Sequence, residues 1–394
     1  MSSALTPFYG EFLMHPIPIH LSGNWCSHNC SYCFANLNVP DRQMNLHDTL
    51  LSIKNYHKHD SLLADLLRLK YPVCVSNHVD PFSISNHRQL VPLMRALIEE
   101  DIPIYIQTKG GVQSAIDEIL EILPQSVWYI SISHDNEETR SLIEKPTPKI
   151  EERFELIKRL KKLGHKVQVG INPLYYGWIK NPEQYIFNLK DLDVDSVVIQ
   201  LLGLTNNQIK NIPQKSKVAL EPVIKDMRLN CKTVRSDGLR DLLDSFMDKC
   251  DDADLDYFVY GDYNYSNALN VVHDVYEKTF PTIQDFINYC HVQKITVFDF
   301  QDYWNYFDSW LPDLKHTSHH KYMTSKMQVN QIPFEIPTGK IGYKEILYMA
   351  WLSERISGHP INYVSFAYLV DDNGDKILDS KYNLPQFIFN PKGW

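Results

Sequence analysis

The chain has 394 residues, of which 44% are apolar and 22% are charged, and its formal net charge is −9. This length allows a large core or two domains, and this composition is ordinary for a soluble globular protein. The negative charge excludes a global basic field that would attract nucleic acid, and no apolar run reaches the ~18 residues of a membrane span.

Short apolar strand candidates alternate with amphipathic helix candidates between residues 15 and 228. Strands are predicted at 15–21, 71–77, 103–108, 128–133, 166–172 and 195–202. Helices are predicted at about 46–69, 87–100, 113–122, 150–163 and 182–190. This alternation predicts a parallel sheet with right-handed crossover connections.

The pattern changes after about residue 228. Helices are predicted at 236–249, 282–290 and 343–357, and a hairpin is predicted from Val364–Val370, through Asp-Asn-Gly, to Ile377 and Leu378. We interpret this part as an extension and not as a seventh β/α unit. The chain is therefore expected to have two parts, 1–228 and 229–394, of which the second closes the open side of the sheet and shapes a substrate pocket.

Three cysteines follow the first predicted strand: Cys26, Cys30 and Cys33, with the spacing C-x3-C-x2-C. No fourth cysteine lies near them in the chain, since the next is Cys74. Iron–sulfur cubes are normally held by four thiolates. Three thiolates would leave one iron of the cube open for a ligand that is not protein.

Structural zinc is the alternative metal for this motif, and it usually takes four Cys or His ligands. His28 is the candidate for the fourth ligand, although its position inside the x3 loop makes it awkward to reach the same ion. Cys231, Cys250 and Cys290 are widely dispersed, so a second cluster is not expected. The chain has seven cysteines without paired spacing. That number favours a reducing compartment and hence a cytoplasmic location.

The cysteine spacing, with Tyr32 before the third cysteine, resembles the radical S-adenosylmethionine (SAM) superfamily. In that superfamily the open iron of a [4Fe–4S] cluster chelates the amino and carboxylate groups of SAM. An electron from the cluster then cleaves SAM and releases a 5′-deoxyadenosyl radical. The resemblance implies an α/β fold, namely a partial (β/α)6 barrel of the TIM type with residues 229–394 as a mixed α+β extension. In such barrels the chemistry lies at the C-terminal ends of the strands.

Several strand-end stretches between about residues 20 and 175 resemble the spore photoproduct lyase and DNA-repair-photolyase-like branch of that superfamily. They are Cys74–Phe82, Gln107–Lys109, Ser131–Ser133 and Arg140–Pro146. The resemblance implies that Ser76 and Lys109 contact the methionine part of SAM, whose carboxylate requires a cation and whose amine requires acceptors. The other candidates for cofactor contacts lie at or near strand ends, and they are Asn77, Ser131, Ser133, Glu144, Asn172 and Gln200.

Cys74 and Tyr32 are the candidate catalytic residues. In spore photoproduct lyase a cysteine that matches Cys74 gives a hydrogen atom to the product radical, and Tyr32 matches a tyrosine near its hydrogen-transfer relay. The alternative for Cys74 is a small buried apolar side chain in a parallel strand. Phe34 stands where that lyase has a second tyrosine, and this departure speaks against simple orthology.

The implied protein is a radical SAM enzyme of lyase or isomerase type. Its adenosyl radical would abstract hydrogen from a pyrimidine (thymine-derived) nucleobase in DNA or a nucleotide, for repair-like lysis or a base-modification rearrangement. Two alternatives stay open: radical SAM modification of a peptide or small metabolite, and a zinc- or cluster-stabilised binding protein. The implied partners are SAM, a nucleobase, nucleotide, DNA or peptide substrate, and an electron donor of the flavodoxin or ferredoxin type, without a membrane.

Overall fold

The structure is a computed structural model of the chain. It describes residues 16–19, 26–33, 46–59, 62–75, 79–112, 114–204, 209–210, 212, 214–221, 238–259, 270–277, 283–293, 300–310, 318–319, 340–341, 368–370 and 376–378.

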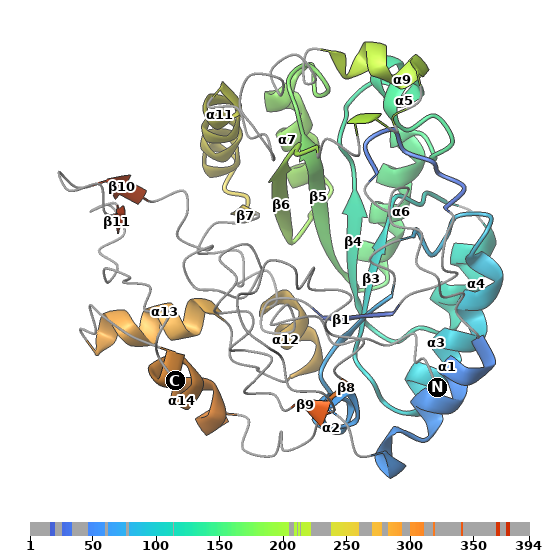
Figure 1. Cartoon of the computed structure of the whole chain (residues 1–394). Helices are drawn as coiled ribbons and strands as arrows, with labels where there is room; N and C mark the ends of the chain where they lie inside the picture. Colours follow the sequence, from blue (N-terminus) through green and yellow to red (C-terminus); the bar gives the residue numbers. More distant parts are fainter. Residues whose placement is uncertain are drawn as a thin grey trace. The chain divides into compact units, whose positions relative to one another are not determined.

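A seven-stranded sheet in sequential strand order is the centre of the fold (Figure 1). Its strands are β1 (Ile17–Ile19), β2 (Val73–Val75), β3 (Ile104–Thr108), β4 (Val127–Ser131), β5 (Lys166–Leu174), β6 (Ser196–Leu201) and β7 (Tyr257–Val259). All neighbouring pairs from β3 to β7 are parallel. Within the described residues the first and last strands do not pair with each other, so the sheet is an open, partial barrel of the TIM type, as predicted.

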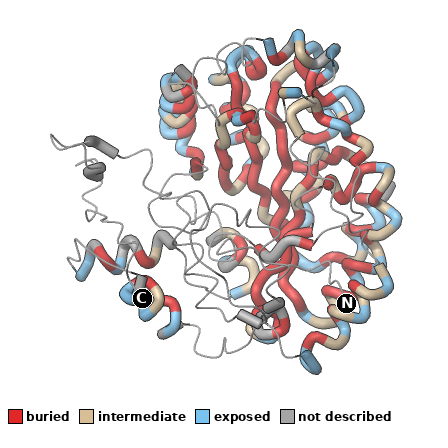
Figure 2. Tube along the Cα trace, in the orientation of Figure 1, coloured by how far each residue is buried: buried red, intermediate tan, exposed pale blue. Residues whose placement is uncertain are grey.

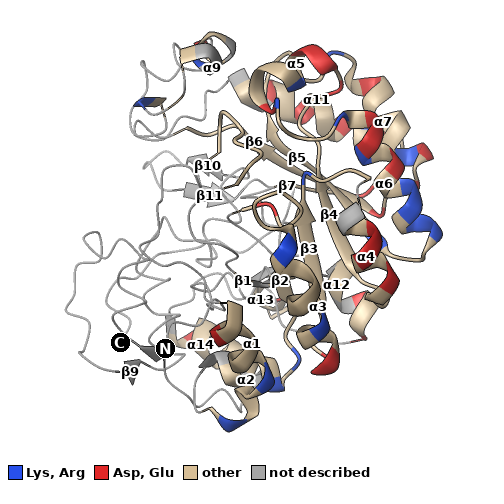
Figure 3. Cartoon of the chain, turned by 90° about the vertical axis from the view of Figure 1, so that its right-hand side faces the viewer, with Lys and Arg blue, Asp and Glu red and all other residues tan. Residues whose placement is uncertain are grey.

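Helices connect these strands. They are α1 (Leu46–Lys54), η3 (Tyr56–Lys58), α2 (Leu62–Arg68), η4 (His87–Gln89), α3 (Leu90–Glu99), α4 (Ser114–Ile122), α5 (Glu137–Ile143), α6 (Ile150–Lys162), α7 (Pro182–Asp191), α9 (Gln214–Ala219) and α11 (Gly238–Asp252). Figures 1 and 3 show α3, α4, α6 and α7 along one side of the sheet, with charged residues gathered on these helices and few on the strands. Strands β2 to β5 are mostly buried, whereas the helices alternate between buried and exposed residues (Figure 2).

All six predicted strands are present, to within two residues at each end. The predicted helix 46–69 is broken into α1, η3 and α2, because Asn55 leaves the helical backbone (φ −120°, ψ 13°), and asparagine has a low helix propensity. Helix α5 was not predicted. It is too short for a clear apolar period, and its signal is the N-cap Asn136, whose side chain accepts from the Thr139 amide at 2.9 Å.

The prediction that no further β/α unit follows the sixth strand is wrong. Helix α11 leads into β7, which pairs parallel to β6 through Val197 opposite Tyr257 and Ile199 opposite Val259. β7 has three residues, as β1 and β2 have, but the surrounding sequence 251–265 is rich in aspartate and tyrosine and gives no distinct strand pattern. The sheet therefore has one strand more than we expected.

The chain divides into two compact units, and the first includes residues 74–260. The second includes residues 54–73 and 261–394, with α12 (Asn270–Tyr276), α13 (Ile283–Val292), α14 (Phe300–Trp310), β8 (Ser318–His319), β9 (Lys340–Ile341), β10 (Tyr368–Val370) and β11 (Lys376–Leu378). The predicted hairpin is confirmed, since β10 pairs antiparallel with β11. The predicted helix 343–357 lies outside the described residues.

Aromatic side chains hold α13 and α14 together in the second unit. The rings of Phe286 and Tyr303 are 5.0 Å apart in an edge-to-face arrangement, and those of Tyr303 and Phe307 are 4.9 Å apart. None of the helices in the described ranges is long and apolar enough to cross a membrane.

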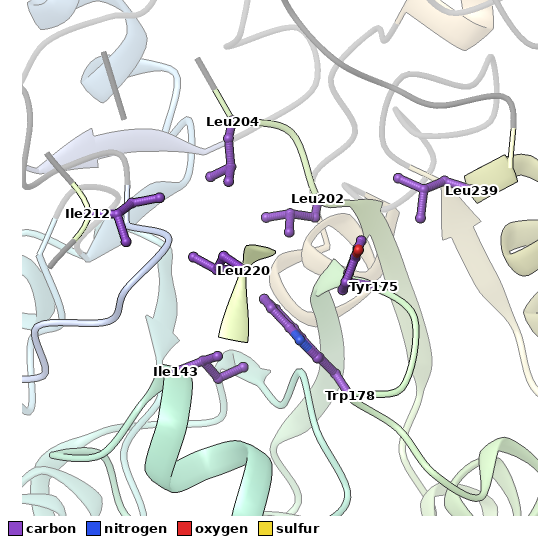
Figure 4. Packing of buried hydrophobic residues seen from close by; sticks show 8 residues of the cluster. All are labelled: Ile143, Tyr175, Trp178, Leu202, Leu204, Ile212, Leu220 and Leu239. Carbon is purple, nitrogen blue, oxygen red and sulfur yellow. The ribbon is translucent and has the colours of Figure 1, made fainter. Parts of the chain in front are cut away.

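An apolar cluster lies near the C-terminal ends of β5 and β6. Figure 4 shows its eight side chains, Ile143, Tyr175, Trp178, Leu202, Leu204, Ile212, Leu220 and Leu239. Each such buried side chain stabilises the fold by about 1.5–3 kcal/mol. Tyr32 packs against this cluster, with its ring 5.5 Å from that of Trp178. The cluster therefore anchors the segment that carries the three cysteines.

Candidate active site

The three cysteines lie on two consecutive turns after β1. The Asn29 amide donates to the Cys26 carbonyl, and the Cys33 amide donates to the Cys30 carbonyl, both at 3.1 Å. Asn29 has a positive φ of 41°, a conformation that asparagine tolerates better than most residues. The Ser31 amide donates to the Ile143 carbonyl at 2.8 Å. These bonds fix the cysteine loop, residues 26–33, next to the end of α5.

The donor chemistry of this loop suits a metal cluster. None of the three cysteines forms a disulfide, and two of them, Cys26 and Cys30, are buried. Burial raises the pKa of the Cys30 thiol well above its ordinary value, and the charge of Glu144 adds to this, while Lys109 opposes it. The thiols would have to release their protons to bind a metal.

Within the described ranges, no group of three or more His, Cys, Asp or Glu side chains converges as on a single metal ion. A tetrahedral zinc site requires four such ligands around one ion, so the zinc alternative with His28 as fourth ligand gains no support. A cube binds its cysteines through separate iron atoms, so its ligands do not have to meet at one point. The residues present fit a cube with three thiolate ligands better than they fit zinc.

Glu144 is the centre of a buried polar network. Its side chain is fully buried, and its carboxylate lies 3.0 Å from Lys109 Nζ, 2.8 Å from an Arg153 guanidinium nitrogen and 3.2 Å from His134 Nε2. The Tyr32 hydroxyl also donates to this carboxylate. Burial alone would raise the pKa of Glu144, but Lys109 and Arg153, together with His134, hold it well below its ordinary value.

Lys109 and Ser131 are joined in the same network. The Lys109 ammonium donates to Ser131 Oγ at 2.6 Å, and this hydroxyl donates to the Asn172 backbone carbonyl at 3.2 Å. The Lys109 nitrogen also lies 5.4 Å from the centre of the Tyr32 ring. Ser133 Oγ is 3.5 Å from the Tyr32 hydroxyl. Side chains from β3, β4 and the cysteine loop therefore meet around Glu144.

The other predicted site residues are less closely connected. Cys74 is buried in β2 and only 3% exposed. Gln200 is half-buried near the end of β6, and the described part of the chain shows no contact between it and the Glu144 network. Ser76 and Asn77 lie outside the described residues.

Three residues of this region were not among the predicted site residues: Asp80, His134 and Arg153. Arg153 occupies the apolar stripe of α6, where Leu156, Ile157 and Leu160 are also buried. A cation at such a position indicates a buried partner, and this signal is visible in the sequence. Asp80 lies within the Cys74–Phe82 stretch of the resemblance, which gives it no role of its own. Nothing in the sequence distinguishes His134 from other polar residues after a strand.

Comparison with known proteins finds a family match over part of the chain. Residues 21–177 match the family model described as the Radical SAM superfamily. Comparison with curated proteins gives no match. Among solved structures, spore photoproduct lyase complexed with dinucleoside spore photoproduct is similar with 16% identity and a TM-score of 0.45, over 62% of this chain and 75% of that one. Streptococcus suis SuiB bound to precursor peptide SuiA is similar with 15% identity and a TM-score of 0.41, over 62% of this chain and 49% of that one.

An open α/β barrel with a three-cysteine loop beside its strand ends defines a radical SAM fold. Residues 21–177 accordingly form a domain of the Radical SAM superfamily. Enzymes of this superfamily use a [4Fe–4S] cluster and SAM. The predicted family, fold class and cofactors are thereby confirmed.

Proposed function

We propose that the protein is a radical SAM enzyme, of lyase or isomerase type, that acts on a pyrimidine (thymine-derived) nucleobase in DNA or a nucleotide. When bound, the cluster supplies the electron that cleaves SAM and yields the 5′-deoxyadenosyl radical, which takes hydrogen from the substrate. The observation that carries this proposal is the meeting of Lys109, Ser131 and Tyr32 around Glu144. These residues belong to the stretches that resemble the spore photoproduct lyase branch. The reaction proposed for the substrate is a repair-like lysis or a rearrangement.

In this proposal Cys26, Cys30 and Cys33 hold the cluster. Lys109 binds the carboxylate of SAM, because its ammonium is only 17% exposed and is already oriented by two partners, Glu144 and Ser131. Such preorganisation lowers the cost of ordering the side chain when the ligand binds. The remaining candidates for cofactor contacts are Ser76, Asn77 and Ser133, from stretches that carry the resemblance, and Asn172 and Gln200, from their position at strand ends.

A second candidate substrate is a peptide or small metabolite. The acidic end of α11 favours a peptide, because Asp251 and Asp252 of this helix and Asp254 after it are exposed and would attract a basic chain. The two similar solved structures hold a dinucleoside and a peptide respectively, and they do not decide between these substrates. A cluster-stabilised binding protein without catalysis is the non-enzymatic alternative.

We propose residues 1–228 as the catalytic barrel and residues 229–394 as a substrate-shaping extension, although β7 of the second part also adds a strand to the sheet of the barrel. The proposed electron donor is a flavodoxin- or ferredoxin-type protein, and the proposed location is the cytoplasm. An oxygen-sensitive cluster requires such a reducing environment.

The test is anaerobic reconstitution followed by product analysis. The reconstituted protein should be brown, bind about four irons per chain and release 5′-deoxyadenosine from SAM on reduction. Mass spectrometry should then find a modified thymine-containing oligonucleotide or nucleotide, and no change in control peptides. A modified peptide with unchanged nucleic acid would contradict the nucleobase proposal, and a protein that binds iron but never cleaves SAM would contradict enzymatic function.

Lys109→Ala is expected to weaken SAM binding by ~1.5–3 kcal/mol, the range for a charge-assisted hydrogen bond. Iron content should remain normal, because Lys109 is not a cluster ligand. Calorimetry of SAM binding to the reconstituted protein measures the difference. Lys158→Ala is the matched control, since Lys158 is exposed on α6. Equal SAM affinity of the Lys109→Ala and wild-type proteins would show that Lys109 serves Glu144 alone.

Cys74→Ala is expected to leave SAM cleavage intact and to change the products. Burial raises the pKa of the Cys74 thiol, which keeps its S–H bond available for hydrogen-atom transfer to a product radical. Without that hydrogen atom, altered or adducted products should accumulate and be resolved by mass spectrometry. Cys290→Ala, at another buried cysteine, is the control. An unchanged product profile and rate would show that Cys74 only fills space in β2.

A further inference from the structure

The turn at residues 80–86, which we call the Asp80 turn, is fixed by its own hydrogen bonds. Asp80 Oδ1 accepts from the Phe82 amide at 2.9 Å. The Asp80 carbonyl accepts from the Ser83 amide at 3.2 Å and from Asn86 Nδ2 at 3.0 Å. Both Ser83 and Asn86 are fully buried. This turn is therefore a rigid support and not a loose connection.

The Asp80 carboxylate also joins the turn to the end of β3. Its Oδ1 accepts from the Thr108 hydroxyl at 2.8 Å, and its Oδ2 accepts from the Lys109 amide. Burial would raise the pKa of Asp80, but His28 and these hydrogen bonds lower it. The carboxylate therefore stays charged in a buried position, 7% exposed, between two structural elements.

The same turn contacts the cysteine loop at two further points. Ser85 Oγ accepts from the Ser27 amide at 3.3 Å. His28 Nε2 lies 3.4 Å from Asp80 Oδ2, and both side chains are buried. Ser27 and His28 stand between the first two cysteines, so the Asp80 turn fixes the segment that joins Cys26 to Cys30.

The Asp80 turn also faces Cys26. Burial and the charge of Asp80 raise the pKa of the Cys26 thiol, and the Asp80 and His28 amides and the Ser83 hydroxyl partly offset this rise. In the structure the Ser83 hydroxyl donates to the Asp80 carbonyl at 2.9 Å. That carbonyl already has two other donors, the Ser83 amide and Asn86 Nδ2. The hydroxyl is therefore able to turn to a thiolate without leaving the carbonyl unsatisfied.

Donors and charges next to a cysteine ligand change the potential of an iron–sulfur cluster. Reduction adds one electron, taken here from a flavodoxin- or ferredoxin-type donor, so a hydrogen bond to the sulfur stabilises the reduced form. A neighbouring carboxylate destabilises the reduced form. We infer that the Asp80 turn positions the cysteine loop and sets the reduction potential of the cluster, with Ser83 raising it through Cys26 and the Asp80 charge lowering it. This inference rests on the cluster of the proposed function.

Two variants should shift the potential in opposite directions. Ser83→Ala removes a donor without changing charge, and the midpoint potential should fall. Asp80→Asn removes a negative charge but keeps one oxygen acceptor, and the potential should rise. For each we expect at least a tenfold change in the one-electron equilibrium constant, about 59 mV. Redox titration of the reconstituted proteins, followed by electron paramagnetic resonance, measures the potentials, with iron content determined in parallel.

Ser126→Ala and Asp195→Asn are the matched controls. Ser126 is a buried serine hydrogen-bonded to Trp128 and His165, and Asp195 pairs with Lys161 and Lys166, so neither variant should shift the potential.

Unchanged potentials in both test variants, or shifts of the same sign, would overturn the inference while the proposed function stands. If Asp80→Asn binds less iron than the wild type, the positioning role of the turn is supported. The midpoint potential of Ser83→Ala then decides whether the turn also sets the reduction potential of the cluster. A wild-type protein that binds no cluster would overturn both proposals.

Discussion

Cys30→Ala is expected to abolish reductive SAM cleavage. Cys30 is the central cysteine of the loop and is 5% exposed, and a missing thiolate would leave the cube with too few ligands. The variant should bind less iron and release no 5′-deoxyadenosine under anaerobic reduction, measured by chromatography. The same outcome is expected for Cys26→Ala and Cys33→Ala, since all three thiolates are proposed ligands.

Cys250→Ala and Cys290→Ala are the matched controls for this experiment. Both residues are fully buried on helices α11 and α13, and each is a small apolar side chain in its core. Their alanine variants should keep the cluster and cleave SAM at the wild-type rate. Full cleavage by Cys30→Ala would disprove the cluster assignment, whatever the iron content of the protein.

The convergence of Lys109, Ser131 and Tyr32 was predictable in part, because the C-terminal ends of parallel strands meet at one edge of a sheet. The sequence placed Lys109 after β3 and Ser131 at the end of β4. Glu144 is different, since it lies after α5, a helix that the sequence pattern did not show. Glu144 is the common partner of side chains from separate elements. Such tertiary contacts cannot be read from the hydrophobic periodicity of the sequence, which reports only local structure.

The fold was predicted better than the contacts between its parts. The six predicted strands lie in apolar runs that carried a clear signal, whereas β7 (Tyr257–Val259) was missed because it lies in a segment rich in aspartate and tyrosine. In the site, the contacts of the Asp80 turn could likewise not be predicted from the sequence. Its residues Asp80, Ser83 and Ser85 are ordinary turn residues, and only the folded chain shows that they contact the cysteine loop.

Glu144→Gln is expected to destabilise the folded protein by ~3–5 kcal/mol at neutral pH, the cost of breaking a buried ion pair. The side chains of Glu144, Arg153 and His134 are all fully buried, so a neutral amide would leave the Arg153 guanidinium without its counter-charge. Urea unfolding of the wild-type and variant proteins, followed by circular dichroism, gives the difference. The measurement is made on the protein without cluster, so that loss of iron does not contribute to the difference.

The pH dependence of this difference distinguishes a charge effect from a packing effect. The pKa of Glu144 in the folded protein is well below its ordinary value of 4.5. Its carboxylate therefore stabilises the folded state fully above the unfolded-state pKa, and this contribution is lost only as the pH falls through the lowered pKa. The difference between wild type and Glu144→Gln should stay constant at neutral pH and shrink below about pH 4.3.

Glu138→Gln is the control for the charge effect, because Glu138 forms an exposed ion pair with Lys180 and its side chain is 73% exposed. Exposed pairs contribute little to stability, so this variant should unfold at the wild-type urea concentration at every pH. A Glu144→Gln protein that unfolds at the same urea concentration as Glu138→Gln would show that water, and not Glu144, satisfies Arg153 and Lys109. A loss of stability that persists unchanged below the lowered pKa of Glu144 would instead show that the amide disturbs packing, since the carboxylate of the wild type is protonated there.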